Sequence, residues 1–138
     1  MNITQESDYA IRIILCLAQH QCRMDARTIS EEMKVSLRFA LKILGKLVSS
    51  NIAVSYKGNR GGYELARPSS EITLLDVIQA VEGSYMLSRC LDECGVCNRK
   101  AAGVCAFRPV FQRISDQVNQ ELAAVTFEDM VKGKTLEA

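Results

Sequence analysis

One stretch decides the fold class of this chain: Ile52-Ala-Val-Ser-Tyr-Lys-Gly-Asn-Arg-Gly-Gly-Tyr-Glu-Leu-Ala66. Its first five residues alternate as in a β-strand, and residues 63–66 are typical of a second short strand. The six residues between them contain three glycines, which permit a tight turn. The sequence therefore predicts a β-hairpin that carries the positive side chains of Lys57 and Arg60 at its tip.

Helices are predicted on the amino-terminal side of this hairpin. Asp25 can cap a short helix that extends to about residue 33, and Ser36 can cap a longer one that extends to about residue 50. Thr4 can cap an earlier helix that ends near residue 20. Two helices joined by a tight turn and followed by a hairpin are the pattern of a winged helix-turn-helix domain, which binds DNA.

Candidate DNA contacts fall on the second of these two helices and on the hairpin, or wing. An arginine at a wing tip suits the minor groove, where the potential is most negative. The formal net charge is only +1, so binding must rely on local clustering of positive charge. An ordinary solvated hairpin tip is the alternative interpretation of the wing. The candidate contacts are Ser36, Arg38, Phe39, Lys42, Lys57, Asn59 and Arg60.

The second half of the chain holds a helix, a cysteine-rich segment and another helix. Thr73 and Asp76 predict a capping box, and Gly83 ends the helix that it starts. Four of the six cysteines then fall within residues 90–105, which show no apolar periodicity and are predicted to be a loop. A long helix follows from about Phe107, and its apolar stripe needs more cover than one small domain provides, so a helix–helix homodimer is expected. The stripe consists of Phe107, Val110, Phe111, Ile114, Val118, Leu122 and Val125.

These elements define the expected architecture. The 138 residues are predicted to form a mainly α fold with a small β-wing, divided into a winged helix-turn-helix domain (1–83), a cysteine-rich loop (84–106) and a dimerisation helix with a short turn (107–132).

No signal peptide or apolar run long enough to span a membrane is recognised, so a cytoplasmic protein is expected. Thiols stay reduced there, which favours metal or redox chemistry over a disulfide.

The cysteine-rich loop allows three kinds of chemistry. Iron–sulfur clusters are held mainly by thiolates, and zinc favours four thiolates with spacings such as that of Cys94 and Cys97. A thiol switch would use a cysteine near positive charge, such as that of Arg99. The residues alone leave cluster and zinc equally open. Outside the loop, Cys16 is expected to be a buried apolar thiol, Cys22 has no expected role, and the only histidine, at position 20, is expected to contact a helix dipole rather than bind a metal.

Four segments together resemble the Rrf-type family of bacterial winged-helix transcriptional regulators, and the resemblance covers residues 1 to about 132. The wing and the Glu82-Gly83 ending are the most specific matches. The segments are Ser7-Asp-Tyr-Ala-Ile-Arg12, Ser36-Leu-Arg-Phe-Ala-Leu-Lys-Ile-Leu44, Lys57-Gly-Asn-Arg-Gly-Gly-Tyr-Glu-Leu-Ala-Arg-Pro68 and Ile72-Thr-Leu-Leu-Asp-Val-Ile-Gln-Ala-Val-Glu-Gly83.

The resemblance implies a homodimeric repressor that binds a palindromic operator in double-stranded DNA. It also implies that Cys90, Cys97 and Cys105 hold an iron–sulfur cluster, either 2Fe-2S or 4Fe-4S, which senses iron, redox state or nitric oxide. Cys94 is additional to the family pattern, and either Cys94 or Asp8 of the partner subunit would complete the ligands. Cluster-free members, which respond to a metabolite, a partner protein or thiol oxidation, provide the alternative. No nucleophile-and-base arrangement accompanies these residues, so an enzyme is not expected.

Overall fold

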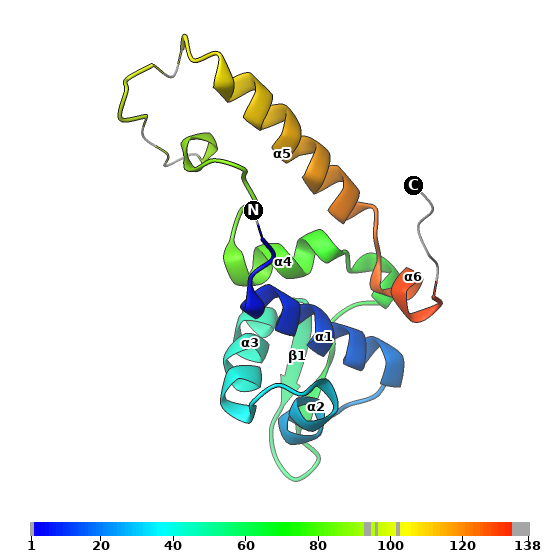
Figure 1. Ribbon diagram of the computed structural model, residues 1–138. Helices are drawn as coiled ribbons and strands as arrows, with labels where there is room; N and C mark the ends of the chain where they lie inside the picture. Colours follow the sequence, from blue (N-terminus) through cyan, green and yellow to red (C-terminus); the bar gives the residue numbers. More distant parts are fainter. Residues whose placement is uncertain (1, 93–94, 96, 102, 134–138) are drawn as a thin grey trace.

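The computed structural model describes residues 2–92, 95, 97–101 and 103–133. It is mostly helical with one two-stranded antiparallel sheet, which confirms the predicted fold class (Figure 1). Two short 3₁₀ turns, η1 (Ser69–Glu71) and η2 (Arg89–Leu91), complete the ordered elements. The helices and strands are α1 (Gln5–His20), α2 (Ala26–Met33), α3 (Leu37–Ser49), β1 (Ala53–Tyr56), β2 (Gly62–Leu65), α4 (Leu74–Glu82), α5 (Phe107–Ala123) and α6 (Phe127–Val131).

The helices begin at the residues that the sequence predicts as caps. The side chains of Thr4, Asp25 and Ser36 each accept a hydrogen bond from the backbone N–H three residues further on. Thr73 and Asp76 form the predicted capping box at the start of α4. Each cap satisfies N–H groups that a helix leaves unpaired at its start, and each stabilises the fold by about 1 kcal/mol.

Helix α1 is the centre of the core. It packs against α2, α3, α4 and α6, and Figure 1 shows these helices around it. Ile13, Ile14 and Leu17 on its inner face are at most 1% exposed. Each such side chain stabilises the fold by about 1.5–3 kcal/mol through removal of apolar surface from water. Because α1 packs against the other helices of the DNA-binding part, its position fixes theirs.

The cysteines of the amino-terminal part lie as the sequence predicts. Cys16 is fully buried, whereas Cys22 is exposed. Burial and the neighbouring Glu32 carboxylate raise the pKa of Cys16 to about 12, and its thiol donates to Glu32 Oε2 over 3.4 Å. His20 lies in the last turn of α1, and its Nε2 is 2.8 Å from the same Glu32 oxygen. This contact between α1 and α2 was not predicted.

The wing is an antiparallel hairpin that a third segment holds at its edge. Its register pairs Ala53 with Leu65 and Tyr56 with Gly62. The backbone of Met24 adds a bridge to Tyr63, with N···O distances of 2.9 and 2.7 Å. Gly62 has φ of 151°, and a Cβ there would lie 2.6 Å from the carbonyl oxygen of Met24. The wing therefore depends on glycine at the point where it approaches the loop before α2.

Helix α6 contributes to the same core. Phe127 is fully buried, and its backbone N–H donates to the carbonyl oxygen of Ile72 over 3.0 Å. A second backbone bond, from Leu74 to Val125, joins the same two segments. The sequence predicts a short helical turn here, which is confirmed, but it gave no indication that Phe127 belongs to the core.

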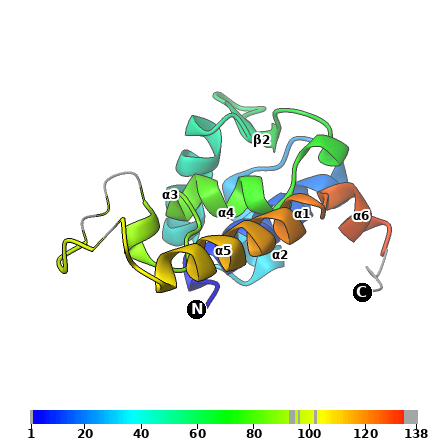
Figure 2. The same ribbon diagram turned by 90° about the horizontal axis from the view of Figure 1, so that it is seen from above.

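The long helix α5 contacts α4 but runs obliquely to it, and the cysteine-rich segment precedes the end of α5 that points away from the core (Figures 1 and 2). Ser115 is the only buried residue of α5, whereas Phe107 and Val110 are 61% and 42% exposed. The predicted apolar stripe is thus only partly covered by this chain. Across the part of the chain that the structure describes, no helix is sufficiently long and apolar to cross a membrane.

Candidate nucleic-acid interface and cysteine cavity

Helix α3 presents two cations to solvent. Arg38 and Lys42 are exposed, and the Lys42 ammonium is 3.6 Å from Glu6 Oε1 and 5.4 Å from the centroid of the Phe39 ring. Phe39 itself is half-buried and packs edge-on against Tyr9 of α1, with ring centroids 5.6 Å apart. The predicted contacts Ser36, Arg38 and Lys42 are therefore accessible, whereas Phe39 packs between α3 and α1.

The wing tip is fully accessible. Lys57, Asn59 and Arg60 are all exposed, and the turn that carries them is closed by a 2.9 Å hydrogen bond from the N–H of Gly61 to the carbonyl oxygen of Gly58. The wing packs next to α3 through β1, so both lie in the same half of the molecule (Figure 1). A positively charged hairpin beside an exposed basic helix is a geometry that can contact phosphates and a groove together.

Arg23 lies in the segment before α2 and supports the wing, a role that the sequence did not predict. Its guanidinium lies 3.4 Å from the centroid of the Tyr56 ring, and its Nη1 donates to the carbonyl oxygen of Arg60 over 3.1 Å. Tyr56 in turn donates to Glu64 Oε1 over 2.6 Å, and this hydrogen bond raises the pKa of Tyr56. Arg23 thus holds both strands of the wing. No local signal identifies it, because every partner lies more than thirty residues further along the chain.

The structure brings three of the predicted metal ligands together. Cys90, Cys97 and Cys105 are all half-buried and line one small cavity together with Gly95 and Arg108. Cys94 lies outside the described residues. Three thiols at one cavity are a donor set that suits an iron–sulfur cluster or zinc. The positive charge of Arg108, beside them, would balance the negative charge of thiolates.

The thiols of this cavity have polar neighbours. Backbone N–H groups of Ala101 and Arg99 lower the pKa of Cys97, because they stabilise its thiolate. The Cys90 sulfur lies 3.2 Å from the hydroxyl oxygen of Ser88. A lowered thiol pKa favours both metal binding and reaction with oxidants.

Glycine is required at one point of the cavity wall. The N–H of Gly95 donates to the carbonyl oxygen of Asp92 over 2.8 Å, which closes a tight turn. A Cβ at this position would overlap the carbonyl oxygen of Arg89. A residue with a side chain would therefore push apart the segment that carries Cys90 and the one that carries Cys97.

Two hydrogen bonds from α5 close the base of the cysteine loop. The Ser115 hydroxyl accepts from the N–H of Leu87 over 2.8 Å, and the Asn119 amide donates to the carbonyl oxygen of Tyr85 over 3.1 Å. The first residues of the loop, just after α4, are therefore held against the side of α5. Sequence reasoning missed both polar residues, which lie next to the apolar stripe.

The point where the loop leaves α4 is also tied to the DNA-binding helices. The Glu82 carboxylate accepts hydrogen bonds from the hydroxyls of Thr4 and Ser7 at the start of α1. Burial acts to raise the pKa of Glu82, but these hydrogen bonds outweigh it and lower the pKa overall. Lys46 of α3 donates to the carbonyl oxygen of Val81 over 3.2 Å. A displacement of this end of α4 would therefore act on α1 and α3 directly.

Asp8 lies apart from the cavity within this chain. Its carboxylate is 2.7 Å from Nη2 of Arg12, on a half-exposed part of α1. It is not among the described residues that line the cysteine cavity. Of the four predicted metal ligands that the structure describes, it therefore brings three together and leaves Asp8 in an ion pair on α1.

The fold and the two basic elements define a winged-helix DNA-binding regulator. The family model described as "Rrf2: Iron-dependent Transcriptional regulator" matches residues 3–133, so the chain belongs to the Rrf2 family of transcriptional regulators. This confirms the predicted family, and a transcriptional regulator, not an enzyme, is the class of protein that the family defines.

The chain is also similar to individual proteins over nearly its whole length. The chain is 29% identical over 135 residues to protein aau3 of Rhizobium meliloti, which covers 97% of this chain and 87% of that protein. It is 26% identical over 136 residues to the transcriptional regulator NsrR of Oceanobacillus iheyensis, with coverage of 97% and 92%. Its fold superposes on that of CymR, the global cysteine regulator of Bacillus subtilis, with a TM-score of 0.76, 22% identity and coverage of 98% and 99%.

Proposed function

We propose that this chain is a homodimeric repressor whose binding to a palindromic operator is controlled by an iron–sulfur cluster, 2Fe-2S or 4Fe-4S, in the cysteine cavity. The observation that carries the proposal is that Cys90, Cys97 and Cys105, far apart in a loop, line one cavity. Iron–sulfur clusters are held by thiolates of this kind, and a bound cluster would supply sensitivity to iron, redox state or nitric oxide. The fourth ligand would be Cys94 or Asp8 of the partner subunit.

The chain's own contacts support a connection between cavity and DNA. The cysteine loop begins where Glu82 and Lys46 join the end of α4 to α1 and α3. Asp8 offers a second connection, because its carboxylate pairs with Arg12 of the same helix. Ligation by Asp8 would compete with that pairing, and Arg12 also reaches the carbonyl oxygen of Met33 at the end of α2.

Operator binding is assigned to the residues that face solvent on α3 and the wing. Ser36 caps α3 at the end that would enter the major groove, and the wing would contact the minor groove or phosphates. Phe39 is assigned a supporting role through its packing on Tyr9. The remaining contacts are Arg38, Lys42, Lys57, Asn59 and Arg60.

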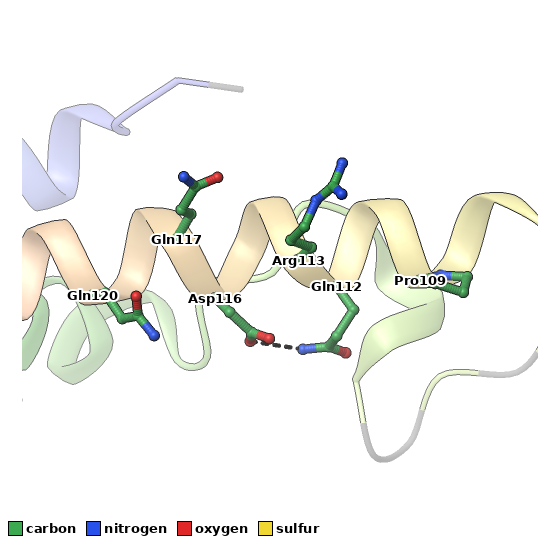
Figure 3. Close-up of a pocket in the computed structure, with 6 residues that line it drawn as sticks. All are labelled: Pro109, Gln112, Arg113, Asp116, Gln117 and Gln120. Atoms are coloured by element: carbon green, nitrogen blue, oxygen red, sulfur yellow. Dashed lines mark hydrogen bonds between the residues drawn. The ribbon is translucent and has the colours of Figure 1, made fainter.

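Dimerisation is assigned to the exposed part of α5. Its stripe of Val110, Phe111, Ile114 and their neighbours is only partly covered by this chain, and Val110 is 42% exposed. The opposite face of the helix is polar and carries the hydrogen bond from Gln112 to Asp116 (Figure 3). Ile114→Glu should therefore give monomers in sedimentation experiments, whereas Gln120→Glu, on the same polar face as Gln112 and Asp116, should leave the dimer intact.

The decisive experiment is visible absorption of protein purified without oxygen, combined with binding to duplexes selected from a random pool. Wild-type protein should be coloured, and Cys90→Ala, Cys97→Ala and Cys105→Ala should each remove the absorption. Cys22→Ala serves as the control, because this cysteine is exposed and remote from the cavity lining. A colourless wild-type protein, or a full spectrum in Cys97→Ala, would refute the cluster assignment.

A thiol switch is the second candidate function. The lowered pKa of Cys97 favours its thiolate, which is the form that oxidants attack. In that case colourless protein would bind DNA and would change its affinity when treated with peroxide. Substitution of Cys97 alone would abolish the change, whereas a cluster protein would require all three cavity cysteines for its response.

A further inference from the structure

We propose that Cys16, His20 and Glu32 form a second metal site, suited to a zinc ion, that joins α1 to α2 within the DNA-binding part of the molecule. This site is separate from the cysteine cavity and does not depend on it. The three side chains come from two helices, and one donor atom of each lies within 4.8 Å of those of the other two.

The spacing of the donor atoms fits a small tetrahedral ion. Cys16 Sγ is 3.4 Å from Glu32 Oε2, and His20 Nε2 is 2.8 Å from the same oxygen. Zinc binds sulfur at about 2.3 Å and nitrogen or oxygen at about 2.0 Å, which places neighbouring ligands about 3.3–3.5 Å apart. A shift of roughly half an ångström would bring the His20–Glu32 pair to this spacing. The donor atoms of Cys16 and His20 lie within 4.8 Å of each other.

The sequence places these ligands by helical geometry. Cys16 and His20 are one turn apart on α1, so both project from the same face. Glu32 lies near the end of α2, which packs against that face. A thiolate, an imidazole and a carboxylate are the three ligand types that zinc accepts, and the thiol proton would pass to solvent on binding.

The burial of the group also suits a metal. Cys16 is fully buried, whereas the side chains of His20 and Glu32 are 40% and 38% exposed. The ion would enter from solvent, and its fourth position would remain open to water. Met24, whose sulfur is 3.8 Å from that of Cys16, closes the inner side with apolar surface. The hydrogen bonds that Glu32 Oε2 makes with Cys16 and His20 already hold the three donor groups together without an ion.

The test is a cobalt(II) titration, because cobalt replaces zinc and its visible and near-ultraviolet bands report thiolate coordination. The full chain would carry serine at the four loop cysteines, so that these cannot bind the probe. Wild-type residues at positions 16, 20 and 32 should then give one tetrahedral cobalt per chain with a sulfur-to-cobalt band, and zinc should displace it.

Three variants and two matched controls make the test specific. His20→Ala and Glu32→Gln should weaken cobalt binding at least tenfold, and Cys16→Ser should remove the sulfur band. Glu31→Gln and Cys22→Ala should leave affinity and spectrum unchanged, since both residues are exposed and outside the group. His20 and Glu32 lie at the surface, so their variants keep the fold, which circular dichroism would verify.

The same experiment can overturn the proposal. Equal cobalt affinity in the loop-serine protein and in its His20→Ala and Glu32→Gln variants would place the ion elsewhere. An absence of the sulfur band at saturation would exclude Cys16 as a ligand. A zinc-dependent rise in melting temperature that disappears in Glu32→Gln but persists in Glu31→Gln would support the cross-link between α1 and α2.

Discussion

The DNA-binding part and the cysteine loop are stabilised in different ways. The first has a core of fully buried side chains from six segments, with α1 at its centre. In the loop, Leu91 is the only buried residue among the described residues of 84–106. Between its described residues, the backbone hydrogen bonds join positions three apart, such as those of Gly95 with Asp92 and Lys100 with Cys97. The first region can hold its shape by its own packing, whereas the second has little beyond its turns to do so.

The largest difference should appear when one apolar side chain is removed from each region. Phe127→Ala should lower the free energy of unfolding by about 3–5 kcal/mol, because it leaves a cavity where α6 packs against α1. Val104→Ala in the loop should change it by less than about 0.5 kcal/mol, since Val104 is 87% exposed. Urea unfolding of both variants gives the comparison. A small loss for Phe127→Ala would mean that α6 is not part of the cooperative core.

Substitution of one glycine in each region should affect different properties of the protein. Gly62→Ala should cost about 1–3 kcal/mol in stability and weaken DNA binding, because its φ is positive and the new Cβ meets the carbonyl oxygen of Met24. Gly95→Ala should leave the unfolding of the DNA-binding part nearly unchanged. It should disturb the cavity, where the new Cβ would meet the carbonyl oxygen of Arg89. Denaturation and visible absorption measure the two effects. If Gly95→Ala keeps the full absorption, the cavity does not set the cluster geometry.

The same contrast explains what the sequence could and could not predict. Caps, helix stripes and the wing were predictable because each depends on residues at most a few positions apart, as with Thr73 and Asp76. Arg23 and Phe127 were not, since their partners lie far along the chain and tertiary packing alone brings them together. The three cavity cysteines were identified through a family resemblance. Their spacing alone did not separate a cluster from zinc.

A third prediction concerns the residue that holds the wing. Arg23→Gln should weaken operator binding about fivefold to tenfold, because loss of the stacking on Tyr56, about 1 kcal/mol, frees both strands. Lys132→Gln, just after α6, removes the same charge from an exposed position and should change affinity much less. Fluorescence anisotropy at one salt concentration compares them. Equal losses would assign the effect to net charge rather than to wing position.

The smallest effect should come from the ion pair between Glu6 of α1 and Lys46 of α3, next to the end of α4. Glu6 Oε1 is 2.6 Å from the Lys46 ammonium, and the hydrogen bond from Lys46 is the main cause of the lowered pKa of Glu6. Because the folded-state pKa lies below the unfolded one, the carboxylate stabilises the fold above the unfolded pKa of about 4.3. That contribution is lost as the pH falls through the folded-state pKa. Lys46 is partly exposed, so the pair should contribute no more than about 1 kcal/mol.

A double-mutant cycle of Glu6→Gln and Lys46→Met isolates this contribution from the bond that Lys46 also makes to Val81. The coupling energy should be constant between about pH 6 and pH 7 and should decline below about pH 4 as Glu6 becomes protonated. Thermal unfolding across this range measures it. A coupling that stays unchanged at the acid end would show that the charge of Glu6 is not its source.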